Sequence, residues 1–202
     1  MVLEENIEHT SILEVIPSFL REAATTIKFN TGDYIVRNGD TPKHVHYVIS
    51  GEIRLVRGLK TGDNIILQRT SSGFIAEASV DANMYQCDMY AAEDSQVTIY
   101  PLEAFNKALS ADASFSQYWI SYLDTEIMRL RCVCERLSLN SARARILHYI
   151  ETEGKQGAIT LTLSRKAWAE ELGLTHEVVY RTLKQLQNED VLNVDGAQLS
   201  LC

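Results

Sequence analysis

The residues with the clearest chemistry lie in the last third of the chain, where charged side chains recur at helical spacing. Glu177 and Arg181 are four residues apart, so a helix places them one turn apart on the same face. An arginine can donate two hydrogen bonds to O6 and N7 of guanine, and a glutamate can accept one from N4 of cytosine. The pair therefore predicts a helix that reads base edges in a DNA major groove, although the same spacing is also typical of an ion pair on a helix surface.

The surrounding sequence predicts a helix-turn-helix that would present this pair. Ser164 and Thr175 each stand where a helix N-cap is needed, and Gly173 supplies a positive φ between the two helices. The second helix covers about 175–188, and its inward positions are Val179, Leu183 and Leu186. The residues expected to contact DNA are Ser164, Arg165, Lys166, Thr175, His176, Glu177, Tyr180, Arg181 and Lys184.

The end of the chain predicts a β-hairpin. Asp195-Gly196 is a two-residue turn signal, and it lies between the apolar runs 191–194 and 198–201. A hairpin directly after a helix-turn-helix makes a winged helix-turn-helix. The small Ala169, the turn glycine and the β-branched Val179 also suit two helices that cross at a tight angle.

The whole chain has a net charge of −8 and a pI of about 5.1, which by itself argues against a nucleic-acid partner. The distribution of the charge along the chain removes this argument. Residues 136–202 carry eight basic and eight acidic side chains, so the whole net negative charge belongs to residues 1–135. Attraction to phosphates is then local to the helix-turn-helix. We expect binding that depends on base contacts rather than on bulk charge.

Composition and targeting signals narrow the class of protein. The chain is 46% hydrophobic, and no apolar stretch approaches the roughly 18 residues that a membrane span needs. Glu4, Glu5 and Glu8 stand where a secretory signal would carry basic residues. We therefore expect a cytoplasmic protein with no membrane partner and with reduced cysteines. No nucleophile with a base, phosphate-binding loop or complete metal-ligand set is recognisable, so no enzymatic activity is expected.

Glycines punctuate the first half of the chain and predict a small antiparallel β structure there. Six of them fall within residues 32–73 and separate short β-branched or aromatic runs. A helical segment, residues 7–24 with an interruption at Pro17, precedes this region. The expected strands are residues 34–36, 45–49, 53–56, 65–67, 84–91 and 96–100.

A long helix is predicted between residues 115 and 139, which contain neither glycine nor proline. Its apolar residues are spaced alternately three and four apart, as in the seam of a coiled coil, so we expect this helix to pair with its copy in a second subunit. The alternative to pairing with a second subunit is that these apolar residues form a stripe that packs on the β-sheet of the same chain. The seam residues are Ile120, Leu123, Ile127, Leu130, Cys134 and Leu137.

Taken together, these features resemble the family of the cyclic-AMP receptor protein and the fumarate-nitrate reduction regulator (the CRP/FNR family) over nearly the whole chain. The resemblance implies an α+β fold with a cupin-like β-roll sensor domain at 1–110, a dimerisation helix at 111–138 and a winged helix-turn-helix at 139–202. The matching segments are Gly32-Asp33, Gly39-Asp40, Ile49-Ser50-Gly51, Gly73-Phe74-Ile75-Ala76-Glu77, Glu135-Arg136-Leu137 and Ser141-Ala142-Arg143, followed by the helix-turn-helix.

The resemblance also implies partners. It implies a homodimer on a near-palindromic double-stranded DNA site, with half-sites about one helical turn apart, and RNA polymerase as a further partner if the protein is an activator. Glu177 and Arg181 match the family's base-reading residues, which favours a TGA-like half-site core. His176 stands where relatives carry Arg or Val, so the remaining base preference stays open.

The resemblance places an effector pocket in the roll at Glu77, Gln86 and Cys87. Relatives that bind cyclic nucleotides hold the ribose with a glycine and a glutamate and the phosphate with an Arg followed by Ser or Thr. Here Ala76 replaces the glycine, Gln86-Cys87 replaces the Arg pair, and no arginine lies between Arg69 and Arg129. A buried phosphate without a guanidinium partner is unfavourable, so cyclic AMP is not expected as effector.

Other effectors and one other function remain open. An iron-sulfur cluster near the N-terminus is not expected, since no cysteine precedes Cys87. His44 and His46 share one strand face and could bind a metal or haem, and Cys134 or Cys87 could act in redox or metal chemistry, but such residues are more often structural. The effector is therefore something other than cyclic AMP, a redox or metal state, or absent. The alternative function is a cupin-like metal-dependent or ligand-binding protein with no role on DNA.

Overall fold

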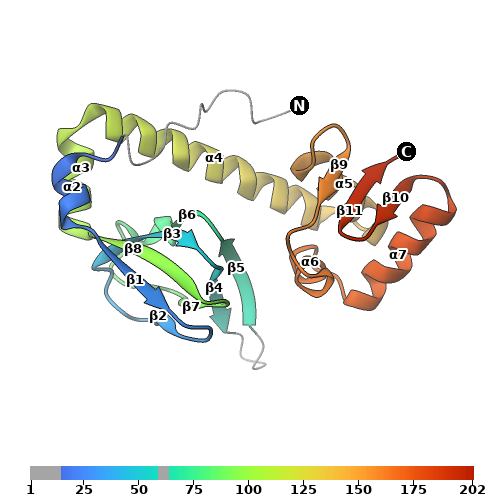
Figure 1. Ribbon diagram of the computed structural model, residues 1–202, viewed down its shortest axis with the longest axis horizontal. Helices are drawn as coiled ribbons and strands as arrows, with labels where there is room; N and C mark the ends of the chain where they lie inside the picture. Colours follow the sequence, from blue (N-terminus) through green and yellow to red (C-terminus); the bar gives the residue numbers. More distant parts are fainter. Residues whose placement is uncertain (1–14, 59–63) are drawn as a thin grey trace. The chain divides into compact units, whose positions relative to one another are not determined.

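The computed structural model describes residues 15–58 and 64–202, and its first part is an antiparallel β-roll (Figure 1). The roll contains two four-stranded sheets, with strand orders β1-β8-β3-β6 and β2-β7-β4-β5. Every neighbouring pair in them is antiparallel. The strands are β1 (Thr25–Phe29), β2 (Tyr34–Val36), β3 (His44–Ser50), β4 (Ile53–Gly58), β5 (Asn64–Thr70), β6 (Gly73–Ile75), β7 (Asp88–Ala91) and β8 (Ser95–Pro101).

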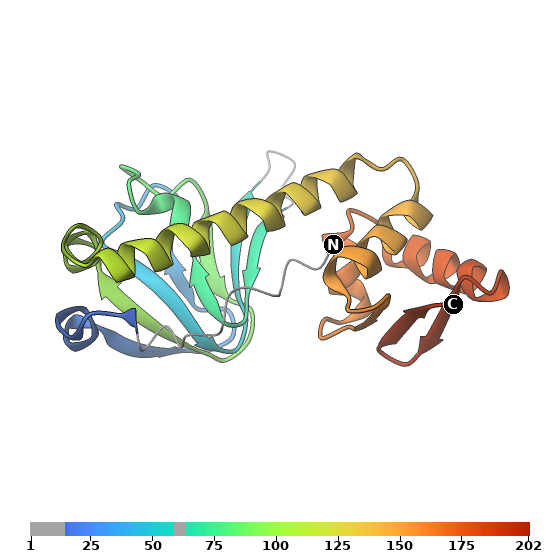
Figure 2. The same cartoon turned by 90° about the horizontal axis from the view of Figure 1, so that it is seen from above.

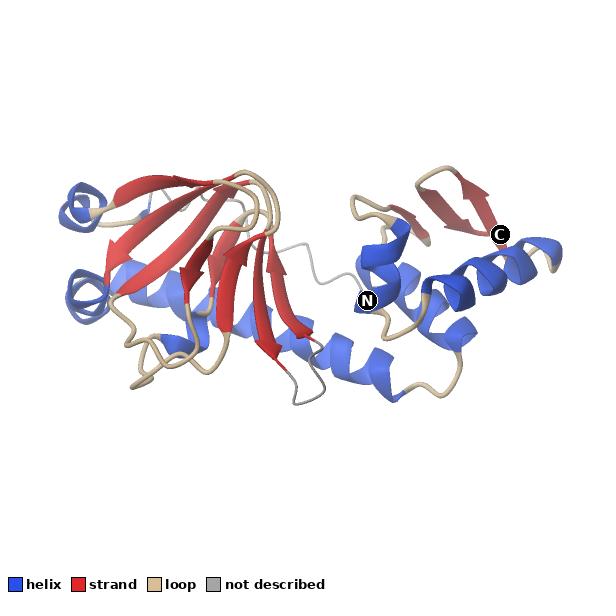
Figure 3. Cartoon of the chain, turned by 90° about the horizontal axis from the view of Figure 1, so that it is seen from below, coloured by secondary structure: helices blue, strands red, loops and turns tan. Residues whose placement is uncertain are grey.

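The core of the roll lies between these two sheets (Figure 3). Alternate residues of each strand point inward, because successive side chains of a strand lie on opposite faces. Val48 and Val97 come from one sheet, and Ile53 and Met89 come from the other; all four are fully buried. The burial of apolar side chains from both sheets holds the sandwich together.

Aromatic side chains attach two helices, the one that carries Phe105 and the next one, which carries Trp119, to the outside of the roll. Phe105 of α3 (Leu102–Ala111) lies with its ring centroid 5.9 Å from that of Phe74 and 5.0 Å from that of Trp119. These pairs meet edge to face, the arrangement that aromatic quadrupoles favour. A shorter helix, α2 (Ser18–Ala23), begins directly after Pro17, as expected, while residues 7–14 of the predicted helix lie outside the described part.

Several strand limits differ from those that the sequence predicted. Strand β7 begins at Asp88 rather than residue 84, because the backbone of Tyr85 bonds to the 39–40 loop instead of to a neighbouring strand: Tyr85 N donates to Asp40 O, and Gly39 N donates to Tyr85 O. Strands β1 and β6 were not predicted. Glu77 lies in a short 3-10 helix, η1 (Glu77–Ser79).

One continuous helix, α4 (Ala113–Ser138), follows the roll (Figure 2). Contacts within the chain divide it into two compact units, and the boundary falls inside this helix, between Ile120 and Ser121. None of the helices in the described ranges is long and apolar enough to cross a membrane. The predicted long helix is thus present with its expected limits to within about two residues.

The last part of the chain is a three-helix unit with a small sheet. It consists of α5 (Ala142–Glu153), β9 (Ala158–Thr160), α6 (Arg165–Glu171), α7 (His176–Asn188), β10 (Leu192–Asp195) and β11 (Gln198–Leu201). The strand order is β10-β11-β9. The hairpin turn comprises Gly196 and Ala197 rather than Asp195-Gly196, since Asp195 still pairs with Gln198. Gly196 has φ +56°, a backbone conformation that glycine adopts without strain.

Candidate nucleic-acid interface

The helix-turn-helix forms through the capping and turn residues that the sequence indicated. The backbone N–H of Ala167 donates to Ser164 Oγ (3.2 Å) at the start of α6, and that of Val178 donates to Thr175 Oγ1 (3.3 Å) at the start of α7. Gly173, between the helices, has φ +63°. These contacts satisfy N–H groups that a helix start leaves without partners, and they fix where each helix begins.

The inner face of α7 is buried, as predicted. Val179, Leu183 and Leu186 pack in a single core with Trp168 of α6 and Ile146 of α5. This helix has a sharp division between apolar and polar faces, which is typical of a surface helix held by one side. Its other face is consequently free to meet a partner.

The outer face of α7 presents the residues of this helix that are expected to contact DNA. His176, Glu177, Tyr180, Arg181 and Lys184 are all exposed, and Tyr180 is 66% exposed. In the part of the chain that the structure describes, no ion pair joins Glu177 to Arg181. The alternative reading of these two residues as a surface ion pair therefore has no support in the geometry.

The Glu177 carboxyl lies near the start of α7. Hydrogen bonding to a backbone N–H and to the Thr175 hydroxyl holds the pKa of Glu177 below its usual value, so the side chain is a charged acceptor. A carboxylate at this end of a helix is also stabilised by the helix dipole. To accept a hydrogen bond from a base, the carboxylate must turn outward from the helix start.

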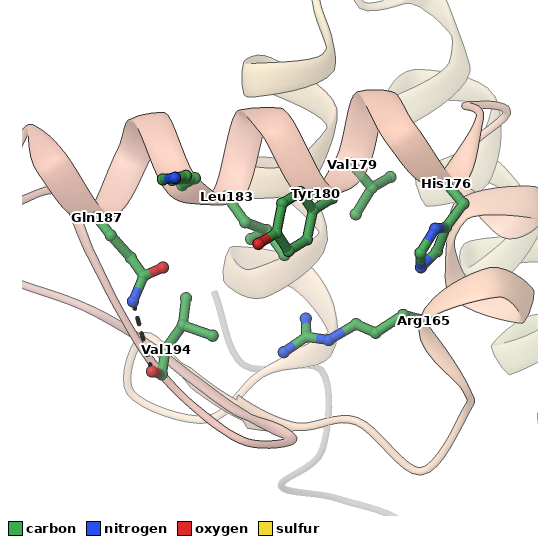
Figure 4. A pocket seen from close by; sticks show the side chains of 8 residues that line it. Arg165, His176, Val179, Tyr180, Leu183, Gln187 and Val194 are labelled. Atoms are coloured by element: carbon green, nitrogen blue, oxygen red, sulfur yellow. Dashed lines mark hydrogen bonds between the residues drawn. The ribbon is translucent and has the colours of Figure 1, made fainter.

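A hollow of about 370 Å³ lies between α7 and the wing formed by β10 and β11 (Figure 4). In the figure, Val179, Tyr180 and Leu183 reach from α7 toward Arg165 and Val194. Its remaining lining residues are His176, Lys184 and Gln187. None of these eight residues is acidic, so the hollow combines apolar walls with basic or neutral polar groups.

Arg165 has a structural contact that the sequence did not indicate. Its Nη2 donates to the carbonyl of Gly196 at the wing tip (2.6 Å), and its guanidinium carbon lies 5.6 Å from the centroid of the Trp168 ring. Partial burial lowers the pKa of Arg165 from its usual value. Arg165 therefore ties the wing to α6, whereas the neighbouring Lys166 is exposed.

The predicted seam of α4 is largely exposed in the single chain. Ile120, Ile127, Leu130 and Leu137 are each 44–52% exposed, Cys134 is exposed, and Leu123 is partly buried. Apolar side chains at this spacing form one stripe along a helix, and a stripe of this kind marks an interaction surface.

The three residues that the resemblance assigns to an effector pocket, Glu77, Gln86 and Cys87, have surroundings that differ from one another. Gln68 Nε2 donates to both carboxylate oxygens of Glu77 (3.0 and 3.2 Å), while Gln68 Oε1 accepts from the backbone of Ala76 (3.2 Å). Ala76 has φ +60°, the conformation that a glycine would adopt more readily. The Gln68 side chain thus contacts the glutamate that the resemblance assigns to the effector pocket.

The other two residues assigned to the effector pocket, Gln86 and Cys87, lie beside Arg57, which the sequence did not place here. Gln86 is exposed and Cys87 is buried, and burial raises the pKa of the Cys87 thiol. Arg57 Nε, from β4, donates to the carbonyl of Gln86 (3.4 Å). Pairing of β4 with β7 brings this guanidinium to the site from about 30 residues earlier in the chain.

The histidine pair lies on the inner face of β3 beside a hollow of about 280 Å³. His46 is only 4% exposed, and burial, reinforced by neighbouring His44, lowers its pKa to about 4, so it is neutral at pH 7. Within residues 15–58 and 64–202, no three His, Cys, Asp or Glu side chains are grouped so as to hold a metal ion. The four cysteines are free thiols. Metal roles for His44, His46 and Cys134 thus gain no support.

Acid is expected to destabilise the roll through His46. In the unfolded chain this imidazole takes up a proton near its usual pKa of 6.5, but in the folded roll it does so only near pH 4. The free energy of unfolding should therefore fall as the pH drops through this window, by roughly 3 kcal/mol in total. Denaturant titrations at pH 7 and near pH 4 would measure the loss. The His46→Gln variant cannot titrate and should lose less; an equal loss would contradict the assignment.

Comparison with known proteins agrees with both parts of the structure. Residues 26–112 match the model of the cyclic nucleotide-binding domain, and residues 143–202 match that of the Crp-like helix-turn-helix domain. A curated relative, the probable transcriptional regulator flp of Lacticaseibacillus casei, is 23% identical over 95% of this chain and 93% of its own length.

Solved structures show the same fold. FixK2 from Bradyrhizobium japonicum aligns with a TM-score of 0.67 at 22% identity, covering 88% of this chain and 92% of its own. A CooA variant from Carboxydothermus hydrogenoformans aligns with a TM-score of 0.72 at 17% identity, covering 100% and 93%. The helix-turn-helix match rules out the alternative of a cupin-like protein with no role on DNA. The chain belongs to the CRP/FNR family of DNA-binding transcription regulators, which are not enzymes.

Proposed function

We propose that this regulator acts as a homodimer that inserts α7 of each subunit into successive major grooves of a near-palindromic DNA site. The observation that carries the proposal is the exposed polar face of α7, directly opposite a buried apolar face. A recognition helix of this kind contacts base edges with residues near its start, and dimers of such domains bind half-sites about one helical turn apart.

Base recognition in this proposal depends on two residues. Arg181 donates to O6 and N7 of a guanine, and Glu177 accepts from N4 of a cytosine, consistent with a TGA-like core in each half-site. Both side chains are exposed and unpaired with each other in the described structure. His176 and Tyr180 lie on the same face and contact the flanking bases.

Contacts to the DNA backbone come from the two helix starts. Ser164 and Thr175, which cap α6 and α7, bring the starts of these helices to phosphates, where the helix dipole favours an anion. Lys166 and Lys184 add positive charge. Arg165 contributes by holding the wing through Gly196 rather than by a free side chain.

Dimerisation through α4 would cover the exposed apolar stripe. Two copies of the helix aligned along this stripe bury Ile120, Ile127, Leu130 and Leu137 against their counterparts, in the manner of a coiled coil. Burial of such side chains drives association because it removes apolar surface from water.

Selection from a random pool of duplexes tests the proposed site. We expect enriched sequences to contain two inverted TGA-like half-sites whose centres are about ten base pairs apart. Footprints should protect both half-sites together. Enrichment of isolated half-sites, or of no common sequence, would contradict the proposal.

The effector of the roll is proposed to be something other than cyclic AMP. The side chain of Gln68 engages the Glu77 carboxylate, and no arginine follows in the segment that would hold the phosphate. Arg57 offers one exposed guanidinium from a different strand, β4, and this group could bind an anion other than cyclic AMP. Micromolar binding of cyclic AMP in a calorimetric titration would overturn this part of the proposal.

The place of action and the further partner follow from DNA binding. We expect the regulator to work in the cytoplasm, together with the DNA that it binds. If it activates transcription, its surface also contacts RNA polymerase. Reporter assays on a promoter with the selected site would distinguish activation from repression.

A further inference from the structure

A single arginine of α5 joins the ends of two other helices. Arg145 donates from Nε to the carbonyl of Leu139 (2.9 Å) and from Nη2 to that of Leu137 (3.0 Å), both at the end of α4. Its Nη1 lies within hydrogen-bond distance of the carbonyls of Leu172 (3.1 Å) and Gly173 (3.3 Å), where α6 ends and the turn of the helix-turn-helix begins. One side chain therefore contacts four carbonyls of two helix ends.

The chemistry of the guanidinium explains why an arginine suits this position. The last carbonyls of a helix have no partner within it, and together they carry a partial negative charge. Arg145 places a permanent positive charge and three donor nitrogens in one rigid plane between two such ends. A lysine could supply the charge but has a single nitrogen, which cannot bond carbonyls on both sides in the same way.

The same junction is close-packed. A Cβ atom on Gly173 would lie 3.1 Å from Leu137 Cδ2 and 3.2 Å from Arg145 Nη1. The turn that aims α7 thus rests directly on the last turn of α4. Leu137, named as a seam residue, also contacts this turn, so part of its side chain serves the junction within the chain.

A second arginine holds the same end of α4 from another side. Arg136 is fully buried; its Nη2 donates to Thr152 Oγ1 (3.1 Å) and pairs with Glu153, both in α5. Its guanidinium carbon lies 4.5 Å from the centroid of the Tyr149 ring. With contacts to α5 and to the turn, the end of α4 has little freedom to change its angle to the DNA-binding domain.

We propose that Arg145 is a positioning residue for DNA recognition, which fixes α7 relative to α4 and thereby sets the half-site spacing that the dimer accepts. The inference rests on the proposed homodimer. If two copies pair along α4, the path from the pairing surface to α7 in each subunit runs through the end of α4, where Arg145 holds the turn before α7 and Arg136 holds α5. A junction without Arg145 would let each α7 swing, so recognition of one half-site would survive while the spacing between two would no longer be enforced.

Measuring affinity against spacing tests this role. Duplexes would carry two selected half-sites at the preferred spacing, the same half-sites moved apart or together by one to three base pairs, or one half-site alone. For the wild type we expect a sharp optimum. For Arg145→Gln we expect about tenfold weaker binding at the optimum and a nearly flat dependence on spacing, with the affinity for a single half-site unchanged.

Arg143→Gln is the matched control, because it removes the same charge from the same helix. Arg143 pairs with Glu189 within the DNA-binding domain, and among the described residues none of its hydrogen bonds or ion pairs reaches α4, so the spacing profile of this variant should stay sharp. Should Arg145→Gln melt below the assay temperature, Arg145→Lys keeps the charge, loses the bridging geometry and should show the same flattening.

The outcomes separate this proposal from the one it rests on. A folded Arg145 variant with a wild-type spacing optimum would overturn the positioning role and leave the dimer intact. A wild-type protein that binds one half-site as tightly as two would overturn the dimer on DNA, and the positioning role with it. Flattening in the Arg145 variants but not in Arg143→Gln supports the proposal.

Discussion

Replacing Arg181 with alanine is expected to remove recognition of the selected half-site while leaving the fold and oligomeric state unchanged. The side chain is exposed on α7 and belongs to neither the buried core nor any ion pair of the described chain, so its loss should not disturb packing. A bidentate arginine contact to guanine contributes about 1 to 3 kcal/mol of discrimination per half-site. In a dimer the loss applies twice, so specific affinity should fall by at least about thirtyfold.

The matched variant for this experiment is Lys166→Ala. Lys166 is exposed at the start of α6, where we expect a phosphate contact. Its loss should weaken specific and random DNA to a similar degree and reduce the dependence on salt. Arg181→Ala should instead remove the difference between the two kinds of DNA. Titration of both duplexes at several salt concentrations measures this, and an Arg181→Ala protein that keeps its preference would show that another residue reads the guanine.

Leu130→Asp is expected to convert the protein into monomers that no longer bind a two-half-site duplex. Leu130 is 47% exposed in the single chain and lies in the middle of the apolar stripe of α4. A dimer through this stripe would bury two aspartates close together, and an unpaired buried charge is unfavourable by several kcal/mol. Sedimentation should then show the monomer mass at concentrations where the wild type is dimeric.

Thr125→Asp provides the control for Leu130→Asp. Thr125 is exposed on the same helix, on the side opposite the stripe, so the substitution adds the same charge without touching the seam. It should remain dimeric and bind DNA normally. Persistent Leu130→Asp dimers would show that the subunits associate through a different surface.

The local features of the DNA-binding domain were predictable because they depend on short-range chemistry. Ser164 and Thr175 cap helices that begin one residue later, and Gly173 takes the positive φ that its turn requires. These roles are decided within three or four residues of sequence. The buried and exposed faces of α7 follow in the same way from helical periodicity.

The contacts that sequence reasoning missed join residues far apart in the chain. Arg145 bonds a carbonyl 27 residues away, and Arg57 bonds one 29 residues away. No spacing rule connects such positions, because the sheet pairing or helix packing that brings them together is itself a product of the whole fold. The early start predicted for β7 failed for a related reason, since the 39–40 loop takes the backbone bonds of Tyr85.

The half-exposed stripe on α4 also has a consequence for how the response depends on protein amount. If only the paired form presents two α7 helices, then below the dissociation constant of the pair the number of competent molecules rises with the square of the chain concentration. A doubling of synthesis would then yield about four times as many DNA-binding units. Leu130 and its neighbours would thus make promoter occupancy respond more steeply to expression level than a monomeric regulator with the same α7 could.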